Sequence, residues 1–258
     1  MNNKNYGFKP PVMVPEDFWL GSGKLGSVDL NPQGDWRPYL PQLEHQRKKI
    51  ETQACVSFGT LSALEMIHKL LYFVEPNYSD RFIAKMSETD PNGGNTPKKV
   101  SETIKHAGTI PEMDYPFADS LGEYYQDVPS TLKYLGKVWL GKYGFGYEWV
   151  AKDKLKEALR RSPVGCAVNA WNQNEKGEYI RLGSSNHWCV LVAYDEADRP
   201  VIWDSYDEGL KTLEKDYELD FPQMYVLKKK EIAQGKKKEN IATAIIAILR
   251  RWLADIFS

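Results

Sequence analysis

Cysteine is scarce in this sequence, and so are histidine and net charge. The chain of 258 residues has three cysteines and four histidines, and its formal net charge is −1. So few cysteines, odd in number, argue against a disulfide framework in a chain of this length. A net charge near zero gives no reason to expect nucleic acid as a partner.

Long hydrophobic runs are missing as well. No stretch of 18 or more apolar residues is present, so the sequence predicts no simple membrane-spanning helix. The N-terminal residues MNNKNYGFKPPVMVPEDF lack the apolar run of a signal peptide. We therefore expect a cytoplasmic protein. The glycine-rich stretch 21–26 lacks the strand and helix that would frame a phosphate loop, and no metal-ligand spacing is found, so we expect no cofactor and no metal.

Composition and periodicity divide the chain into a series of segments. Residues 1–34 predict an irregular arm, 35–125 a mainly helical lobe, 126–228 a mainly β lobe, 229–238 a basic linker and 239–258 an amphipathic helix. Helices are expected at residues 55–74, 79–88, 97–107, 152–161 and in the C-terminal segment. Strands are expected at residues 163–171, 187–194, 199–206 and 224–227.

Three residues in this pattern suit thiol catalysis. The periodicity of residues 55–74 places Cys55 in the first turn of a helix, where the helix dipole lowers the pKa of a thiol. His187 opens the alternating run HWCVLVAY and is the candidate base. Asp204 ends the next expected strand, so antiparallel pairing of the two strands would bring it to His187. Taken singly, a buried structural cysteine or histidine is the ordinary alternative.

The stretch TQACVSFGTLSALE resembles the segment around the nucleophile of the papain family, with Cys55, Phe58 and Glu65 at the matching positions. His187 and Asp204 follow at 132 (187 minus 55) and 149 (204 minus 55) residues, and the family places its histidine and asparagine about 130–150 residues downstream.

Further blocks extend the resemblance over roughly residues 35–228. DWR at residues 35–37 resembles the start of the mature family domain, and NGG at residues 92–94 resembles its substrate-binding segment. The resemblance implies an α+β fold of two lobes, one helical and one an antiparallel β-barrel-like lobe, with a cleft between them. It also implies a cysteine endopeptidase that hydrolyses peptide bonds of a peptide or protein substrate through a thioester.

The resemblance assigns roles to this chain's residues. Asp204 stands where the family has an asparagine, and a carboxylate can accept the imidazole N–H as well as an amide can. The family's oxyanion glutamine would fall at Lys49. We therefore favour Gln46, with a lengthened loop, over Gln53, which is so near Cys55 that its side chain would have to fold back.

The resemblance also suggests substrate-binding residues. Gly93 and Gly94 either form a simple turn or expose backbone groups to an extended substrate. Trp188 and Ala167 match positions that flank the family's specificity pocket, although core packing is an equal alternative for Trp188.

Two other interpretations stay open. A cell-wall peptidase or amidase of the NlpC type would use the same Cys-His-acid chemistry. A catalytically silent scaffold would act through the C-terminal helix, whose apolar face and basic flank suit a protein partner or a membrane surface. The sequence leaves open whether residues 1–34 are an inhibitory pro-segment.

Overall fold

A computed structural model describes residues 4–22 and 28–230 of the chain. The chain divides into two compact units, Met1–Lys228 and Lys229–Ser258. The predicted C-terminal helix and all but two residues of the basic linker lie outside the described residues. Among the helices that are described, none is both long enough and apolar enough to cross a membrane.

Helices dominate the first part of the described chain. The α-helices are α1 (Cys55–Tyr72), α2 (Asp80–Met86), α3 (Pro97–Ala107), α4 (Leu121–Tyr124), α5 (Ser130–Lys142) and α6 (Leu155–Leu159). Short 3-10 turns are η1 (Arg37–Tyr39), η2 (Glu112–Asp114) and η3 (Lys152–Lys154). The local sequence sets the start of α3. The Thr96 side chain accepts a hydrogen bond from the backbone N–H of Lys99, and Pro97 occupies the first turn.

Strands dominate the second part. They are β1 (Tyr143–Trp149), β2 (Val164–Val168), β3 (Asn172–Gln173), β4 (Tyr179–Ile180), β5 (His187–Tyr194), β6 (Pro200–Trp203), β7 (Leu210–Thr212) and β8 (Asp220–Lys229). Six of them form a sheet in the order β1-β8-β2-β5-β6-β7, while β3 and β4 form a separate ribbon. The pairs β2/β5, β2/β8, β5/β6 and β6/β7 are antiparallel. Over the described residues this sheet is open, so the lobe is β-barrel-like without being a closed barrel.

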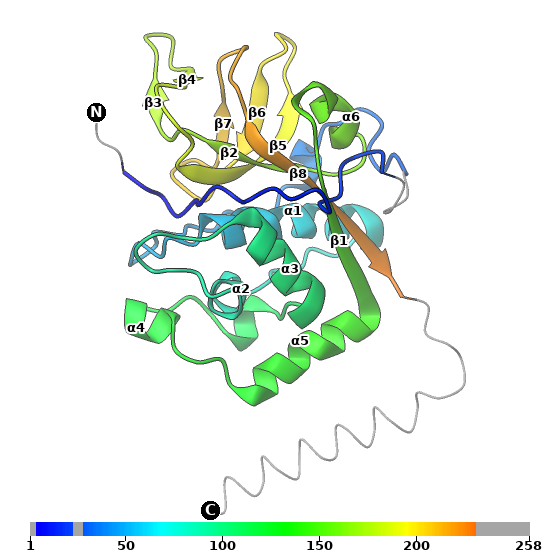
Figure 1. The fold of residues 1–258 in the computed structure, drawn as a ribbon, viewed down its shortest axis with the longest axis vertical. Coiled ribbons are helices and arrows are strands. Elements are labelled where there is room, and N and C mark those ends of the chain that lie inside the picture. The colour runs from blue at the N-terminus through cyan, green and yellow to red at the C-terminus, as the bar shows by residue number, and fades with distance from the viewer. Residues whose placement is uncertain (1–3, 23–27, 231–258) are drawn as a thin grey trace, which may run out of the picture. The chain divides into compact units, whose positions relative to one another are not determined.

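The core joins the two halves through α1 and the central strand β5. Most of α1 is buried, and β5 is buried from His187 to Ala193 because β2 and β6 flank it. A Cβ atom on Gly59 of α1 would lie 2.8 Å from the indole of Trp188 on β5. Helix and strand can therefore approach this closely only because Gly59 has no side chain. In Figure 1 the strands β2, β5, β6 and β7 lie on one side of α1 and the helices α2, α3 and α5 lie on the other, while β1 runs down to α5.

The expected helices and strands match those of the structure best where the apolar pattern of the sequence is strongest. The strand at 187–194 and the helix at 97–107 are found with those bounds. The helix expected at 152–161 is shorter, because its first turn is the 3-10 turn η3. α5 and β1 were not predicted, and α5 adds a further helix to the chain beyond residue 126, where mainly strands were expected.

Candidate active site

Cys55 begins α1, and its side chain is fully buried. Burial raises the pKa of the Cys55 thiol well above its ordinary value, and the carboxylates of Asp204 and Glu51 raise it further. The backbone N–H groups of Trp188 and Val56 lie against the sulfur and oppose this shift. The thiol is therefore protonated at neutral pH in this conformation.

His187 begins β5 and lies beside Asp204, which follows β6. The imidazole Nε2 is 2.5 Å from the Asp204 Oδ1, and both side chains are fully buried. An ionised carboxylate can only accept a hydrogen bond, so Nε2 carries the proton and Nδ1 is the basic nitrogen of the neutral ring. Nδ1 is buried and has no hydrogen-bond partner among the described residues.

The Asp204 carboxylate is ionised although it is buried. Burial by itself raises the pKa of Asp204, but the imidazole of His187 and the ammonium of Lys211 outweigh burial and lower the pKa below its ordinary value. The backbone N–H of Ser205 also donates to Oδ1 at 2.7 Å. Asp204 thus has the protonation state that an acceptor for the imidazole N–H requires.

Aromatic rings surround the imidazole of His187. The rings of Tyr206, Tyr6 and Trp171 have centroids 5.3, 5.7 and 5.7 Å from it, each in an edge-on arrangement. Tyr206 follows Ser205, two residues after Asp204, and its ring is one of the three that lie edge-on to the imidazole. Tyr6 belongs to the N-terminal arm, so one of these three rings comes from a segment outside both halves of the fold.

Gln46 reaches the same site and is fully buried. Its Oε1 accepts a hydrogen bond of 2.9 Å from the Ser205 hydroxyl, which turns the amide nitrogen away from Ser205. Nε2 lies 3.0 Å from Glu51 Oε1, 2.9 Å from the Tyr206 hydroxyl and 3.0 Å from the carbonyl oxygen of Tyr6. Gln46 therefore presents an amide donor to a peptide carbonyl beside His187.

Gln53 is placed differently. Its backbone has a left-handed conformation (φ 55°), and its side-chain Oε1 is buried without a hydrogen-bond partner among the described residues. Of the two glutamines considered, Gln46 is the one whose amide nitrogen contacts a peptide carbonyl.

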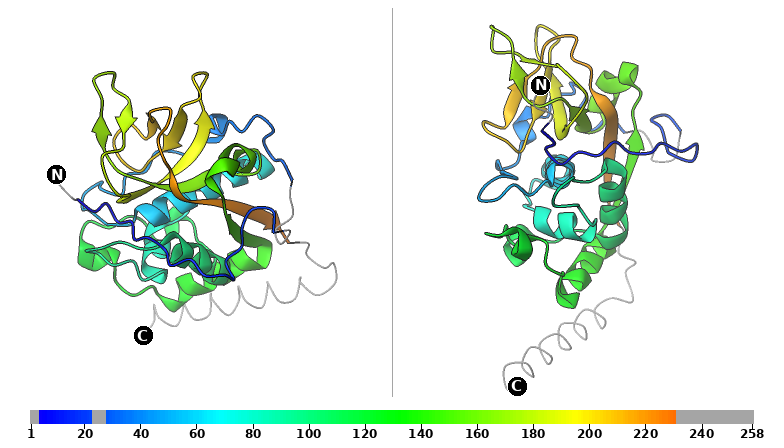
Figure 2. Two further views of the ribbon diagram at one scale, coloured as in Figure 1. Left: turned by 45° about the horizontal axis from the view of Figure 1, so that its top comes forward. Right: turned by 60° about the vertical axis from the view of Figure 1, so that its left-hand side comes forward.

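The N-terminal arm occupies the site. The backbone N–H of Tyr6 donates to the carbonyl of Asn186 at 3.0 Å, on the sheet side. On the helical side, the N–H of Asn95 donates to the Gly7 carbonyl at 2.9 Å and the N–H of Lys9 donates to the Asn95 carbonyl at 2.8 Å. Figure 1 shows this dark-blue segment running between the sheet and the helices, and Figure 2 shows its path from two further sides. The arm thus binds both halves through its main chain.

Two glycines permit this close backbone approach. A Cβ on Gly94 would lie 1.8 Å from the Gly7 carbonyl oxygen, and a Cβ on Gly7 would lie 2.3 Å from the Gln53 carbonyl oxygen. Both glycines also have positive φ angles, of 79° and 106°. The pair Gly93 and Gly94 does meet an extended chain, and that chain is the protein's own arm, with Asn95 making the main-chain pairing.

The residues expected to flank the specificity pocket are buried. Ala167 and Trp188 lie opposite each other in the pairing of β2 with β5, and both have 0% exposure. The ring of Phe8 stacks on Trp188 at 5.9 Å with an interplanar angle of 12°, and it packs at the same distance against Phe221. Trp188 is therefore both a core residue and the surface against which the arm places an aromatic side chain.

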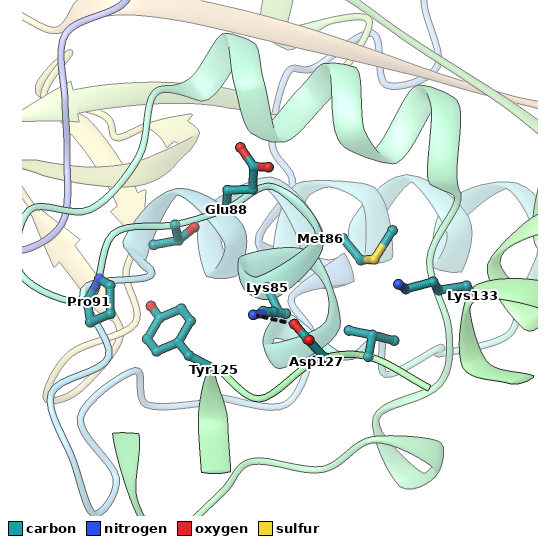
Figure 3. A pocket seen from close by; sticks show the side chains of 9 residues that line it. Lys85, Met86, Glu88, Pro91, Tyr125, Asp127 and Lys133 are labelled. Atoms are coloured by element: carbon teal, nitrogen blue, oxygen red, sulfur yellow. Dashed lines mark ion pairs between the residues drawn. The ribbon is translucent and has the colours of Figure 1, made fainter. Parts of the chain in front are cut away.

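A separate surface pocket of about 580 Å³ lies on the helical half and is lined by none of these site residues. Figure 3 shows Lys85 and Asp127 paired across it, with Met86 and Tyr125 on its walls. The Tyr125 hydroxyl donates a hydrogen bond to the Thr52 carbonyl, three residues before Cys55. Within the described residues, no group of three or more His, Cys, Asp or Glu side chains could hold a metal ion.

Sequence reasoning missed three features of the site. The arm was predicted as irregular, and its polar and aromatic residues 4–9 gave no periodic signal. Lys211 lies in the short strand β7, where a lysine normally faces water. Trp171 follows β2 and had no recognised role. None of these three lies in a motif, so only the tertiary fold brings the arm and Trp171 to His187 and Lys211 to Asp204.

Comparison with known proteins connects this geometry to one fold. No family model matches the sequence, and no curated protein matches it. Solved structures do match. Xylellain, a cysteine protease from Xylella fastidiosa, has a TM-score of 0.61 and 17% identity over 88% of this chain and 96% of that chain.

Two plant enzymes show the same likeness. The ragweed pollen cysteine protease Amb a 11 in its proform has a TM-score of 0.58 and 16% identity, covering 80% of this chain and 68% of that chain. Bromelain from Ananas comosus in complex with the E64 inhibitor has a TM-score of 0.53 and 17% identity, covering 77% and 98%. The fold of this protein is that of the papain-like cysteine proteases, as the sequence predicted.

Proposed function

We propose that this protein is a cysteine peptidase that cleaves peptide bonds with Cys55 as nucleophile, His187 as base and Asp204 as the acceptor that orients the imidazole. The observation that supports it most is the arm itself. An extended polypeptide already lies against His187 and is held by main-chain hydrogen bonds, with a peptide carbonyl at Gln46. A site of this form suits a peptide substrate better than a small molecule.

The proposed reaction has two halves, the acylation of Cys55 and the hydrolysis of the thioester. His187 Nδ1 takes the proton of the thiol, and the Cys55 sulfur bonds to the carbonyl carbon. Gln46 and the backbone N–H of Cys55 donate to the oxyanion. The imidazolium then gives its proton to the leaving amine, which leaves a thioester. Water attacks the thioester while His187 accepts its proton, and the thiol is restored as the acid product leaves.

In this proposal the enzyme is latent while the arm lies in the site. Cys55 and His187 have 0% exposure, and residues 5–9 fill the place of a substrate. Activity then requires that the arm leave. The substitution Gly7→Val should displace it, because a side chain at this position meets the Gln53 carbonyl at 2.3 Å. Val12→Ala, at a residue that is 79% exposed in the same arm, is the matched control.

The test is hydrolysis of a casein-type protein by the intact chain, Gly7→Val, Val12→Ala, and Gly7→Val with Cys55→Ala. We expect strong cleavage only by Gly7→Val with Cys55 present. A peptidoglycan fragment assayed in parallel separates the alternatives, since cleavage of that fragment alone would support the NlpC-type enzyme. If Gly7→Val is folded but cleaves neither substrate and does not react with a peptidyl thiol probe, the chain is a silent scaffold.

A further inference from the structure

Lys211 is a lysine whose ammonium group lies inside the protein, beside the proposed catalytic pair. It belongs to β7, which pairs antiparallel with β6 so that Lys211 lies opposite Ile202. Its side chain has 0% exposure. Lysine is almost never fully buried unless it is paired, because the charged form loses its hydration. Such a placement therefore calls for a specific partner.

The partner is the carboxylate that holds the imidazole. Lys211 Nζ lies 3.0 Å from Asp204 Oδ2 and donates to the Tyr206 carbonyl at 2.6 Å. It also lies over the rings of Trp171 and Tyr179, at 5.3 and 5.8 Å from their centroids. A carbonyl, a carboxylate and two ring faces thus stabilise the ammonium in the positions that water would occupy.

The two oxygens of Asp204 have different partners. Oδ1 accepts from His187 Nε2 and from the backbone N–H of Ser205, while Oδ2 faces Lys211. Rotation of the carboxylate would break both sets of contacts at once. Lys211 therefore fixes the plane of the carboxylate, and through it the direction of the imidazole.

Lys211 also changes the charge that the imidazole meets. A bare aspartate would present −1 to the ring and favour the imidazolium, whereas the buried Asp204 and Lys211 together carry no net charge. The papain family, which the sequence resembles, has a neutral asparagine at this position. We propose that Lys211 is a positioning residue whose ammonium balances Asp204, so that the pair acts on His187 as a neutral acceptor in place of an asparagine.

Other titratable groups near the ring do not supply this balance. Cys55, Glu51, Tyr206 and Tyr6 carry no positive charge in either protonation state. The cations Lys4 and Arg47 act on Tyr6, and neither is among the ion-pair partners of Asp204. Among the described residues, Lys211 is therefore the cation that pairs with Asp204 while the His187 ring is neutral. The inference rests on the proposed function for its kinetic consequences, but the ion pair can be tested without activity.

The kinetic test compares Asp204→Asn, Lys211→Met and the double variant in the full chain that carries Gly7→Val. Asp204→Asn alone leaves a buried ammonium unbalanced, so we expect it to lose more kcat than the double variant does, with at least a tenfold recovery when Lys211→Met is added. Lys211→Met alone should favour the imidazolium and move the alkaline limb of the pH–rate profile up by about one pH unit. Lys156→Met, which breaks a surface pair with Asp198, is the control and should change neither.

The second measurement is thermal unfolding of the same variants in the otherwise intact chain. We expect each single variant to lower Tm strongly. The Tm of the double variant should be well above the value that adding the two losses would give. Additive losses in Tm, or an unshifted alkaline limb in an active Lys211→Met, would overturn the proposal. An inactive parent chain would contradict the proposed function alone, and the unfolding cycle would still decide the role of Lys211.

Discussion

The carbonyl oxygen of Tyr6 accepts a hydrogen bond of 3.0 Å from the amide nitrogen of Gln46. Tyr6 lies edge-on to the imidazole of His187 at 5.7 Å, so this carbonyl is held beside the proposed base. A donor in this place can stabilise the negative oxygen that forms when a thiolate attacks a peptide carbonyl. The arm therefore marks the position of the oxyanion donor in the proposed reaction.

Replacing Gln46 by alanine should slow hydrolysis strongly. In the Gly7→Val chain we expect Gln46→Ala to lower kcat by about 100–1,000-fold, the usual loss for one oxyanion donor. Gln53→Ala is the matched control and should stay near the parent value. Steady-state kinetics on one peptide substrate decide the matter, and a large loss confined to Gln53→Ala would show that the other glutamine is the donor.

The arm should also inhibit when it is supplied as a separate peptide. We expect a peptide of residues 4–11 to compete with substrate for the Gly7→Val enzyme, because its main chain pairs with Asn186 and Asn95 and Phe8 packs on Trp188. Loss of the buried Phe8 side chain should weaken inhibition by about tenfold or more.

A Gly7→Val peptide is the control for this measurement, since its new side chain meets the Gln53 carbonyl. Inhibition constants measured against a fluorogenic substrate give the comparison. Equal inhibition by all three peptides would mean that the arm does not bind in the site as it does in the intact chain.

A partly buried carboxylate on η2 gives the fold a dependence on pH. Burial, together with the charge of Glu44, raises the pKa of Glu112 to about 7, while its Oε1 accepts a hydrogen bond of 2.7 Å from the Phe117 N–H. The folded state thus binds this proton more tightly than the unfolded chain, whose glutamate pKa is about 4.3. Its contribution is fully present below about pH 4.3 and is lost as pH rises to about 7.

Thermal unfolding at a series of pH values tests this dependence. We expect Tm of the intact chain to fall between about pH 5 and pH 7.5, and to fall less in Glu112→Gln, whose amide oxygen can keep the bond to Phe117. Glu175→Gln, on the exposed turn between β3 and β4, is the control and should follow the intact chain. Parallel curves for all three proteins would contradict the assignment to Glu112.

The C-terminal segment yields a prediction from the sequence alone. Its apolar helical spacing over residues 239–258 favours a docking element that takes no part in hydrolysis. Truncation after Lys230 should therefore leave kcat and Tm of the Gly7→Val chain unchanged and abolish partner or vesicle association, as measured by co-sedimentation. A truncated chain that unfolds would show that the helix belongs to the core.

The sequence predicted the elements that carry strong periodicity and the residues that sit at their ends. Cys55 at the start of α1, His187 at the start of β5 and Asp204 after β6 follow from local pattern and antiparallel pairing. The helix α5 was not predicted, because lysines and glycines interrupt its apolar face. Its Trp139 is nevertheless buried and donates a hydrogen bond to the Tyr78 hydroxyl. The arm and Lys211 could not be predicted, since their positions depend on contacts between segments far apart in the chain.

The pH dependence of Cys55 alkylation tests the central claim most directly. While the arm lies in the site, burial raises the pKa of the Cys55 thiol, so alkylation of the intact chain should be slow. Once Gly7→Val has displaced the arm, the helix N-terminus and the imidazole should hold a thiolate, and alkylation should stay fast at about pH 6, below the free-thiol pKa of about 8.5. His187→Ala in the same chain should abolish this fast reaction. A rate that titrates near the free-thiol value, and is the same with and without His187, would contradict the account.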